Sequence, residues 1–478
     1  MVSVTACFSR LAGGLEFAMT FERNDMRMVI SRLVVGGGVL VLVLAAAAAR
    51  LSADPISESD LGKSAPAGTA KPAAAQNPEI AAAIARFQAR DVEGALKLLA
   101  EAAKKDPDMP PAQVILAQLF SRSNLAAGTR ACLEKATFET PDDPEAYLYL
   151  GDMAVREGRI TEAGLLFEKA DSLLNRFTKS AKRKKAMRPM VCGGLASVAE
   201  AHGDWRSAQK QLEVWLTLDP NNGVALQRLA RCRFEQKDTA GALDKLRRAA
   251  KGNPEAMLPE ATVAQFFRQA GDQVNAKKWL TAALSAAPKD VKIRLMAAQW
   301  AFQSGDLGEA KAQADAAMKL DPKSLGVKVL SGLVALFQKD YDTAEMYFES
   351  AHLQAPGDFA AANYLALALV EQKDEAKKQK ALEYAAANVR QFRNRADAIS
   401  TYGWVLYKLG RLDEAERVLG VVASNGAMDA DTKFYLARLS VDRGRDRDAR
   451  QLLESALKTK GPFLQRQEAQ SLWQQLAK

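Results

Sequence analysis

An alanine that returns at a fixed interval is the feature of this sequence that most constrains its fold. Between residues 208 and 344 it recurs every thirty-four residues, within sequence segments that are similar to one another. These alanines are Ala208, Ala242, Ala276, Ala310 and Ala344. A period of this length is typical of helix-turn-helix solenoids, in which each unit packs only on its neighbours. The length of 478 residues therefore measures the number of units rather than a number of separate domains.

Three other residue types recur with the alanine, and each has a physical reason. Small residues in the first helix of a unit let it approach the second helix closely. They are Gly151, Ala196, Ala230, Ala264, Ala298 and Gly332. Turn glycines suit the left-handed backbone that ends a helix. They are Gly158, Gly203, Gly271, Gly305, Gly410 and Gly444. We place the recurring prolines at the start of the following helix, where a missing N–H costs little. They are Pro107, Pro220, Pro254, Pro288, Pro322 and Pro356.

The third unit carries the pattern most fully, with an aromatic residue, Leu-Gly, a turn glycine, an alanine, an aromatic residue and an alanine. The residues are Tyr147, Leu150, Gly151, Gly158, Ala163, Phe167 and Ala170. This pattern resembles the tetratricopeptide repeat. The resemblance implies an all-α, right-handed α-solenoid of about eleven units over residues 78–462, closed by a capping helix at 463–478. The repeat alanine, or the residue in its place, stands at Ala95, Thr129, Ala163, Ala208, Ala242, Ala276, Ala310, Ala344, Ala381, Ala415 and Ala449.

Two intervals break the rhythm: forty-five residues separate Ala163 from Ala208, and thirty-seven separate Ala344 from Ala381. The first break holds the densest basic cluster, Lys179, Lys182, Arg183, Lys184, Lys185 and Arg188. One interpretation is a contact with anionic lipid, polysaccharide or an acidic protein. The other is a solvated helix end. No aromatic residue is interleaved and the net charge of +9 is modest for so long a chain, so nucleic acid is not indicated as a partner.

The N-terminal part predicts a membrane segment. Residues 33–49 carry no charge, Arg32 precedes them and Arg50 follows. This length suits either a transmembrane helix over 33–50 or the apolar region of a signal peptide, with cleavage after Ala49. Basic residues on the N-terminal side keep residues 1–32 in the cytoplasm and direct the repeats to the non-cytoplasmic side, where a bacterial chain meets the periplasm. Translation that begins at Met26 or Met28 would shorten the basic segment, and residues 51–77 read as a disordered linker.

In tetratricopeptide-repeat solenoids the first helices line the concave face, so the resemblance implies a groove that binds proteins or peptides. Its expected middle is polar, with Arg231 and Arg268, and its later part is apolar. The apolar residues are Leu333, Leu336, Phe337, Leu367, Val370, Trp404 and Tyr407. Such a trough suits an amphipathic helix or an extended peptide. The alternative is that these side chains pack against neighbouring repeats or the capping helix. The lysine and asparagine pair by which some members of the family hold a C-terminal carboxylate is absent.

The residues give no support to an enzyme, a cofactor or a metal site. The chain has two histidines, and neither has a partner at the spacing of a metal site or a nucleophile motif. The four cysteines lie far apart and read as small core residues, although spacing alone leaves a disulfide open. We therefore expect a membrane-tethered scaffold that recruits partners for envelope assembly, secretion or polysaccharide export. The alternatives are a secreted periplasmic chaperone or carrier and a cytoplasm-facing adaptor.

Overall fold

A computed structural model describes residues 78–253, 256–426 and 428–476 of the chain, and within these ranges every regular element is an α-helix. None of the helices in these ranges is both long enough and apolar enough to cross a membrane. The predictions for residues 1–77, namely the cytoplasmic segment, the membrane segment and the linker, lie outside the described residues.

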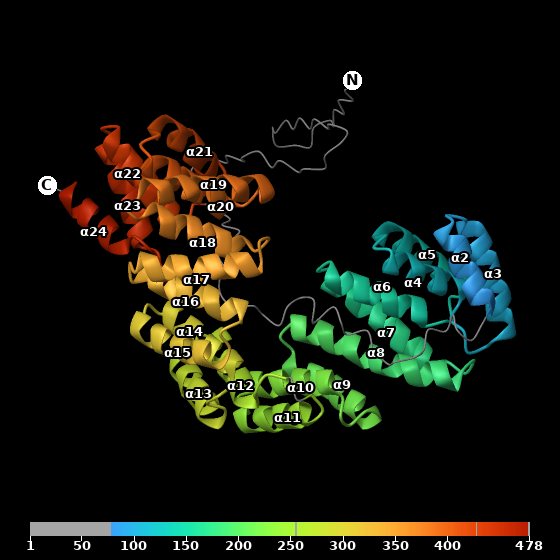
Figure 1. The fold of residues 1–478 in the computed structure, drawn as a ribbon. Helices are drawn as coiled ribbons and strands as arrows, with labels where there is room; N and C mark the ends of the chain where they lie inside the picture. The colour runs from blue at the N-terminus through green and yellow to red at the C-terminus, as the bar shows by residue number, and fades with distance from the viewer. Residues whose placement is uncertain (1–77, 254–255, 427, 477–478) are drawn as a thin grey trace, which may run out of the picture. The chain divides into compact units, whose positions relative to one another are not determined.

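The described helices form eleven hairpins, each made of a first helix and a second helix that pack together, and one final helix (Figure 1). The first helices are α2 (Pro78–Gln88), α4 (Ala112–Arg122), α6 (Glu145–Arg156), α8 (Ala181–Ala201), α10 (Gly223–Glu235), α12 (Pro259–Gln269), α14 (Val291–Gln303), α16 (Leu325–Phe337), α18 (Phe359–Val370), α20 (Ala396–Lys408) and α22 (Ala430–Asp442). The second helices are α3 (Val92–Lys105), α5 (Ala126–Glu139), α7 (Ile160–Arg176), α9 (Trp205–Leu218), α11 (Thr239–Lys251), α13 (Gln273–Ala286), α15 (Leu307–Leu320), α17 (Tyr341–Gln354), α19 (Glu375–Gln391), α21 (Leu412–Ser424) and α23 (Asp446–Leu457). The last helix is α24 (Arg466–Gln475), and it packs on α23.

The eleven hairpins and the terminal helix confirm the predicted fold class. Each second helix also packs on the first helix of the next hairpin, which joins neighbouring units in chain order. The repeat alanines all lie in second helices, and ten of the eleven positions are almost completely buried. The remaining position, which holds a threonine instead of an alanine, is Thr129, and it is 8% exposed. The terminal helix contributes Ala469 and Leu472 to the same buried cluster as α22 and α23.

Most second helices start in one way, because an aspartate follows the turn residue and caps the helix. Asp204, for example, accepts a hydrogen bond from the backbone N–H of Ser207 at 3.1 Å, and Asp272 accepts one from Asn275 at 2.9 Å. An N-cap of this kind satisfies one of the backbone donors that a helix leaves unpaired at its start. In six of the seven second helices capped by aspartate the turn residue before the cap has positive φ, and all six predicted turn glycines have positive φ as well.

The prediction for the prolines was wrong in its placement. Pro220 follows Asp219, the C-cap of α9, and α10 begins only at Gly223. Pro288, Pro322 and Pro356 likewise follow the C-cap residues of α13, α15 and α17. A proline at this position cannot continue the helix, so it terminates the second helix rather than starting the next first helix.

Longer helices account for the two intervals between repeat alanines that exceed thirty-four residues. At the first break, α7 has 17 residues and α8 has 21, compared with 14 and 13 in α9 and α10. The three and eight additional residues account for the whole excess of eleven. At the second break, α19 has 17 residues, and Ala381 is its seventh residue, whereas Ala344 is the fourth of α17. One additional helical turn therefore precedes Ala381.

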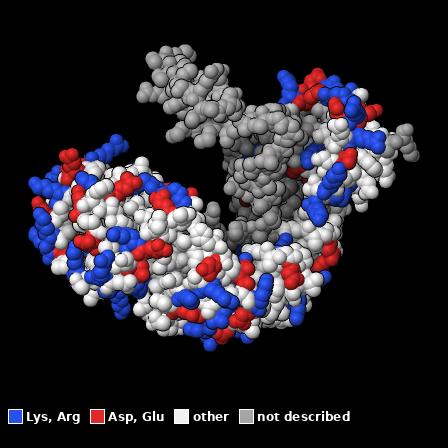
Figure 2. Space-filling view, turned by 180° about the vertical axis from the view of Figure 1, so that it is seen from behind, with Lys and Arg blue, Asp and Glu red and all other residues white. Residues whose placement is uncertain are grey.

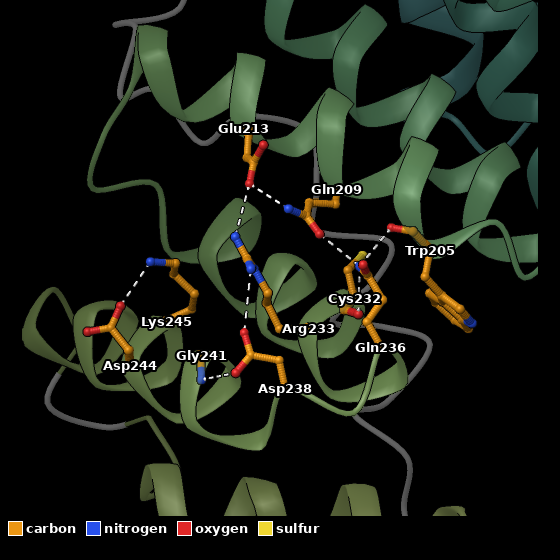
Figure 3. A network of polar contacts seen from close by, with 10 residues as sticks. All are labelled: Trp205, Gln209, Glu213, Cys232, Arg233, Gln236, Asp238, Gly241, Asp244 and Lys245. Atoms are coloured by element: carbon orange, nitrogen blue, oxygen red, sulfur yellow. Dashed lines mark hydrogen bonds and ion pairs between the residues drawn. The ribbon is translucent and has the colours of Figure 1, made fainter.

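Neighbouring hairpins are joined by polar contacts in addition to apolar packing. In Figure 3 the side chain of Gln236, the C-cap residue of α10, reaches Gln209 on α9, with Nε2 to Oε1 at 2.8 Å. Arg233 of α10 lies between Glu213 of α9 and Asp238, the N-cap of α11 (Figure 3). These side chains are partly exposed, so they fix the orientation of the helices more than they add to stability.

Candidate functional site: the first-helix face

The first helices of successive hairpins touch one another at several junctions, and we call the exposed sides of all the first helices together the first-helix face. Direct contacts join α6 to α8, α14 to α16, α16 to α18, α18 to α20 and α20 to α22. This face carries the residues for which a binding role is predicted. Over the side of the molecule shown in Figure 2, basic and acidic residues are interspersed rather than separated by sign.

The polar middle of this face is built from arginines that lie on aromatic rings. The guanidinium of Arg231 lies 5.0 Å from the centre of the Phe266 ring, and its Nη1 donates to Gln269. The guanidinium of Arg268 lies 4.4 Å from the centre of the Trp300 ring. Stacking of this kind favours a cation over the ring and fixes the plane of the guanidinium.

Arg268 differs from Arg231 in its charge partners. Arg231 forms an ion pair with Glu235 at 2.6 Å, whereas Arg268 forms no ion pair with any described residue. Its Nη2 contacts Gln303, and its Nη1 is buried without a hydrogen-bond partner in the described part of the chain. Burial lowers the pKa of Arg268. Burying a donor without an acceptor costs about 1–3 kcal/mol of free energy. A partner that supplies an oxygen atom to Nη1 of Arg268 would recover this free energy on binding.

The predicted apolar residues of the face are mostly inside the repeats. Leu336, Leu367, Val370 and Trp404 are between 0% and 6% exposed. Leu333, Phe337 and Tyr407 are half-buried, and they are the members of this set with surface left for a partner. The rings of Trp404 and Tyr407 stack with centres 5.0 Å apart, and Tyr435 stacks on Trp404 at 4.4 Å.

Glu371 fixes this aromatic stack, and sequence reasoning missed it. Its carboxylate accepts a hydrogen bond from Nε1 of Trp404 at 2.8 Å and from Nζ of Lys408 at 2.8 Å. Glu371 is the C-cap residue of α18, whereas the other two lie on α20, so the contact joins two hairpins. Nothing in the repeat period marks this glutamate, because its partners are set by the packing of helices about 35 residues apart.

The basic cluster at the first break is divided between structural and exposed positions. Arg183 is buried, and its Nη2 bonds Asp143 at 2.8 Å and Glu145 at 2.7 Å. Lys184 donates to the carbonyl oxygens of Asn175 and Phe177, at the end of α7. Arg188 pairs with Asp171 at 2.5 Å. Lys179, Lys182 and Lys185 are exposed and have no ion pair in the described part of the chain.

Sequence reasoning also missed a cleft of about 390 Å³ between α17 and α19, with α18 at its base. His352 and Tyr384 are among its lining residues, and their rings meet edge to face with centres 5.2 Å apart. The only sequence signal near it is the longer interval before Ala381, because the additional turn belongs to α19.

The fold defines the class of helical-hairpin repeat proteins, in which each unit packs on its neighbours. Models of the tetratricopeptide repeat match residues 86–153, 194–256 and 402–464. The chain is a tetratricopeptide-repeat protein, and its repeats form a scaffold for protein–protein interaction. Proteins built from these repeats are generally scaffolds rather than enzymes.

Solved structures with a similar fold have low sequence identity. A tetratricopeptide repeat protein from Parabacteroides merdae is 13% identical, with 61% of this chain and 100% of that chain covered and a TM-score of 0.38. Yeast Tom70 is 14% identical, with 84% and 95% covered and a TM-score of 0.33. YrrB, described as a repeat protein with an unusual peptide-binding site, is 21% identical, with 41% and 97% covered and a TM-score of 0.28. No curated protein matches the chain.

Proposed function

We propose that this protein is a non-enzymatic scaffold that binds other proteins along the polar middle of its first-helix face. The observation that carries the proposal is the Arg268 side chain, which lies on the Trp300 ring with a buried donor that no described residue accepts. An acidic side chain or a backbone carbonyl of a partner would supply that acceptor. Charge-assisted hydrogen bonds in a partly desolvated site are stronger than neutral ones.

The proposal includes a membrane tether. The uncharged residues 33–50, preceded by basic residues, would hold the scaffold at a membrane with its repeats on the non-cytoplasmic side. The scaffold would there recruit partners for envelope assembly, secretion or polysaccharide export. Protease added to intact spheroplasts should then digest the repeats. Protection of the repeats would contradict this orientation and would favour a cytoplasm-facing adaptor, and a mature N-terminus at or after Arg50 would favour a secreted chaperone or carrier.

Photo-crosslinking in cells tests the binding face. A photoreactive residue at position 299, where Gln299 lies half-buried on α14 beside Trp300, should form crosslinks to partner proteins. The matched control is position 274 on α13, where Val274 is 81% exposed on a second helix of the neighbouring hairpin. Crosslinks at 299 that disappear in Arg268→Gln support the proposal. Equal crosslinking at 299 and 274, or crosslinks at 299 that persist in Arg268→Gln, would contradict it.

A further inference from the structure

The cleft between α17 and α19 is much larger than its counterpart one repeat earlier. The equivalent space between α15 and α17 is lined by Lys311, Asp315 and Tyr347, which correspond to Glu345, Glu349 and Tyr384. That space measures about 20 Å³, whereas the cleft between α17 and α19 measures about 390 Å³. The larger volume lies within the range of ligand pockets in proteins.

The lining of this cleft is acidic, although the whole chain has a net charge of +9. Glu345, Glu349 and Glu383 stand against a single basic lining residue, Lys380. Glu345 already pairs with Lys377 at 2.6 Å, which ties the additional turn of α19 to α17. Glu349 and Glu383 are exposed at the rim, and neither forms an ion pair with a described residue. Two carboxylates are therefore available to a cation.

Aromatic rings form part of the wall beside these carboxylates. The Tyr384 ring meets His352 edge to face, and burial raises the pKa of Tyr384, with the charges of Glu349 and Glu383 adding to the effect. Both carboxylates and this ring line the same cleft. An aromatic face with carboxylates beside it suits a guanidinium, which stacks on the ring and bonds carboxylate oxygens in its own plane.

Two buried polar atoms of the lining have no partner. Asn388 is only 3% exposed, and its Nδ2 has no hydrogen-bond acceptor in the described chain. Nδ1 of His352 is also buried without a partner there. Native proteins satisfy the large majority of such groups. A backbone carbonyl of an inserted segment would give Asn388 its acceptor.

We infer that the cleft between α17 and α19 is a second binding site, which takes an arginine side chain from an extended segment of a partner protein. The guanidinium lies between Glu349 and Glu383 against the ring of Tyr384, and the backbone of the segment bonds Asn388. The site is formed by two second helices and one first helix, so it does not depend on the proposed binding role of Arg268.

Three pools of nonapeptides test this site on the full-length protein. The central residue of each pool is arginine, citrulline or glutamate, and the other positions are randomised. Citrulline keeps the shape of arginine without its charge. We expect the arginine pool to be enriched about tenfold over the citrulline pool on the immobilised protein, as for one charge-assisted contact. Equal recovery of the arginine and citrulline pools would overturn the inference.

Matched variants locate the enrichment. The double change Glu349→Gln and Glu383→Gln should abolish it, whereas Glu93→Gln with Glu168→Gln, which alters two exposed glutamates on α3 and α7, should leave it intact. Arg268→Gln should also leave it intact, which separates this site from the first-helix face. Enrichment that survives the cleft variant, or that is lost equally in the control pair, would contradict the inference. Unchanged melting temperatures of all variants confirm that each is folded.

Discussion

Gly332 lies directly against the ring of Phe348, so close that a Cβ atom on this glycine would be 2.7 Å from Cε1 of the ring. Gly332 is on the first helix and Phe348 on the second helix of one hairpin, and Phe348 is fully buried. The same relationship joins Gly151 to Phe167, at 2.9 Å. A large second-helix ring is therefore accommodated by the absence of a side chain on the first helix.

Gly332→Ala should destabilise the protein by about 1–3 kcal/mol, because the added methyl group overpacks a filled interface. The matched control is Gly420→Ala, which also lies within a helix but has no atom within 4 Å of the added Cβ. That change should stabilise by about 0.5–1 kcal/mol, because alanine favours the helix over glycine. Urea titrations followed by circular dichroism would measure both. A neutral result for Gly332→Ala would contradict the packing argument.

Arg183→Ala should cost about 3–5 kcal/mol, because it leaves the buried carboxylates of Asp143 and Glu145 without their cation. Burial raises the pKa of Glu145, and the nearby Arg183 opposes that rise. Lys185→Ala, in the same cluster but exposed, should stay within about 0.5 kcal/mol of wild type. Thermal melts of the two variants at neutral pH give the comparison. Equal losses would mean that the cluster acts through its overall charge rather than through this buried contact.

Lys237→Gly should stabilise the fifth hairpin. Lys237 has φ of 68° at the turn position where six other repeats have glycine. A left-handed conformation costs a residue with a side chain about 1–2 kcal/mol, and glycine avoids this cost. Part of the stabilisation is offset because glycine also makes the unfolded chain more flexible. The converse change, Gly271→Ala at φ of 80°, should destabilise by a similar amount. Hydrogen exchange of the amides of α10 and α11 would report the first change locally, and faster exchange there would contradict it.

The carboxyl group of Asp431 predicts a pH dependence of stability. It accepts a hydrogen bond from the backbone N–H of Leu464 at 3.1 Å, and burial raises its pKa from 3.8 to about 7. Since the folded state holds this proton more tightly than the unfolded state, the contribution of Asp431 is complete below about pH 4 and is lost as the pH rises through 7.

Asp431→Asn mimics the protonated form and isolates this contribution from the other titrating groups. The melting temperature of wild type should match that of Asp431→Asn near pH 4 and fall below it by pH 8. A constant difference between the two proteins across this range would contradict the assignment of the raised pKa to Asp431.

The repeat period predicted the hairpins well because the residues that define each hairpin lie close together in the sequence. The alanine, the small first-helix residue and the turn glycine all lie within about thirty residues of one another, and the structure has them in the expected roles at Ala208, Ala196 and Gly203. Three of the four cysteines, Cys132, Cys192 and Cys232, are buried and free, as expected of core residues, and Cys7 lies outside the described residues. The prolines were misplaced by a few residues because proline is tolerated both before and after a helix.

Contacts between hairpins could not be read from the period. The repeat spacing places Trp404 in the apolar part of the predicted groove. In the structure its side chain is 3% exposed and stacks on the rings of Tyr407 and Tyr435. Arg183 looks like one member of a solvated basic run, yet it reaches carboxylates about forty residues earlier. Spacing fixes which side of a helix a residue occupies, but the neighbouring repeat decides whether that side is covered.

The central claim is that Arg268 provides a partner-binding contact on the first-helix face. The most direct measurement is the affinity of the partner recovered by crosslinking at position 299, determined for wild type, Arg268→Gln and Arg206→Gln. Arg206 is an exposed arginine on α9, so its replacement makes the same change in net charge. Loss of one charge-assisted contact predicts an affinity about tenfold weaker for Arg268→Gln, and unchanged for Arg206→Gln, with all three proteins folded. Equal affinities of wild type and Arg268→Gln would contradict the account.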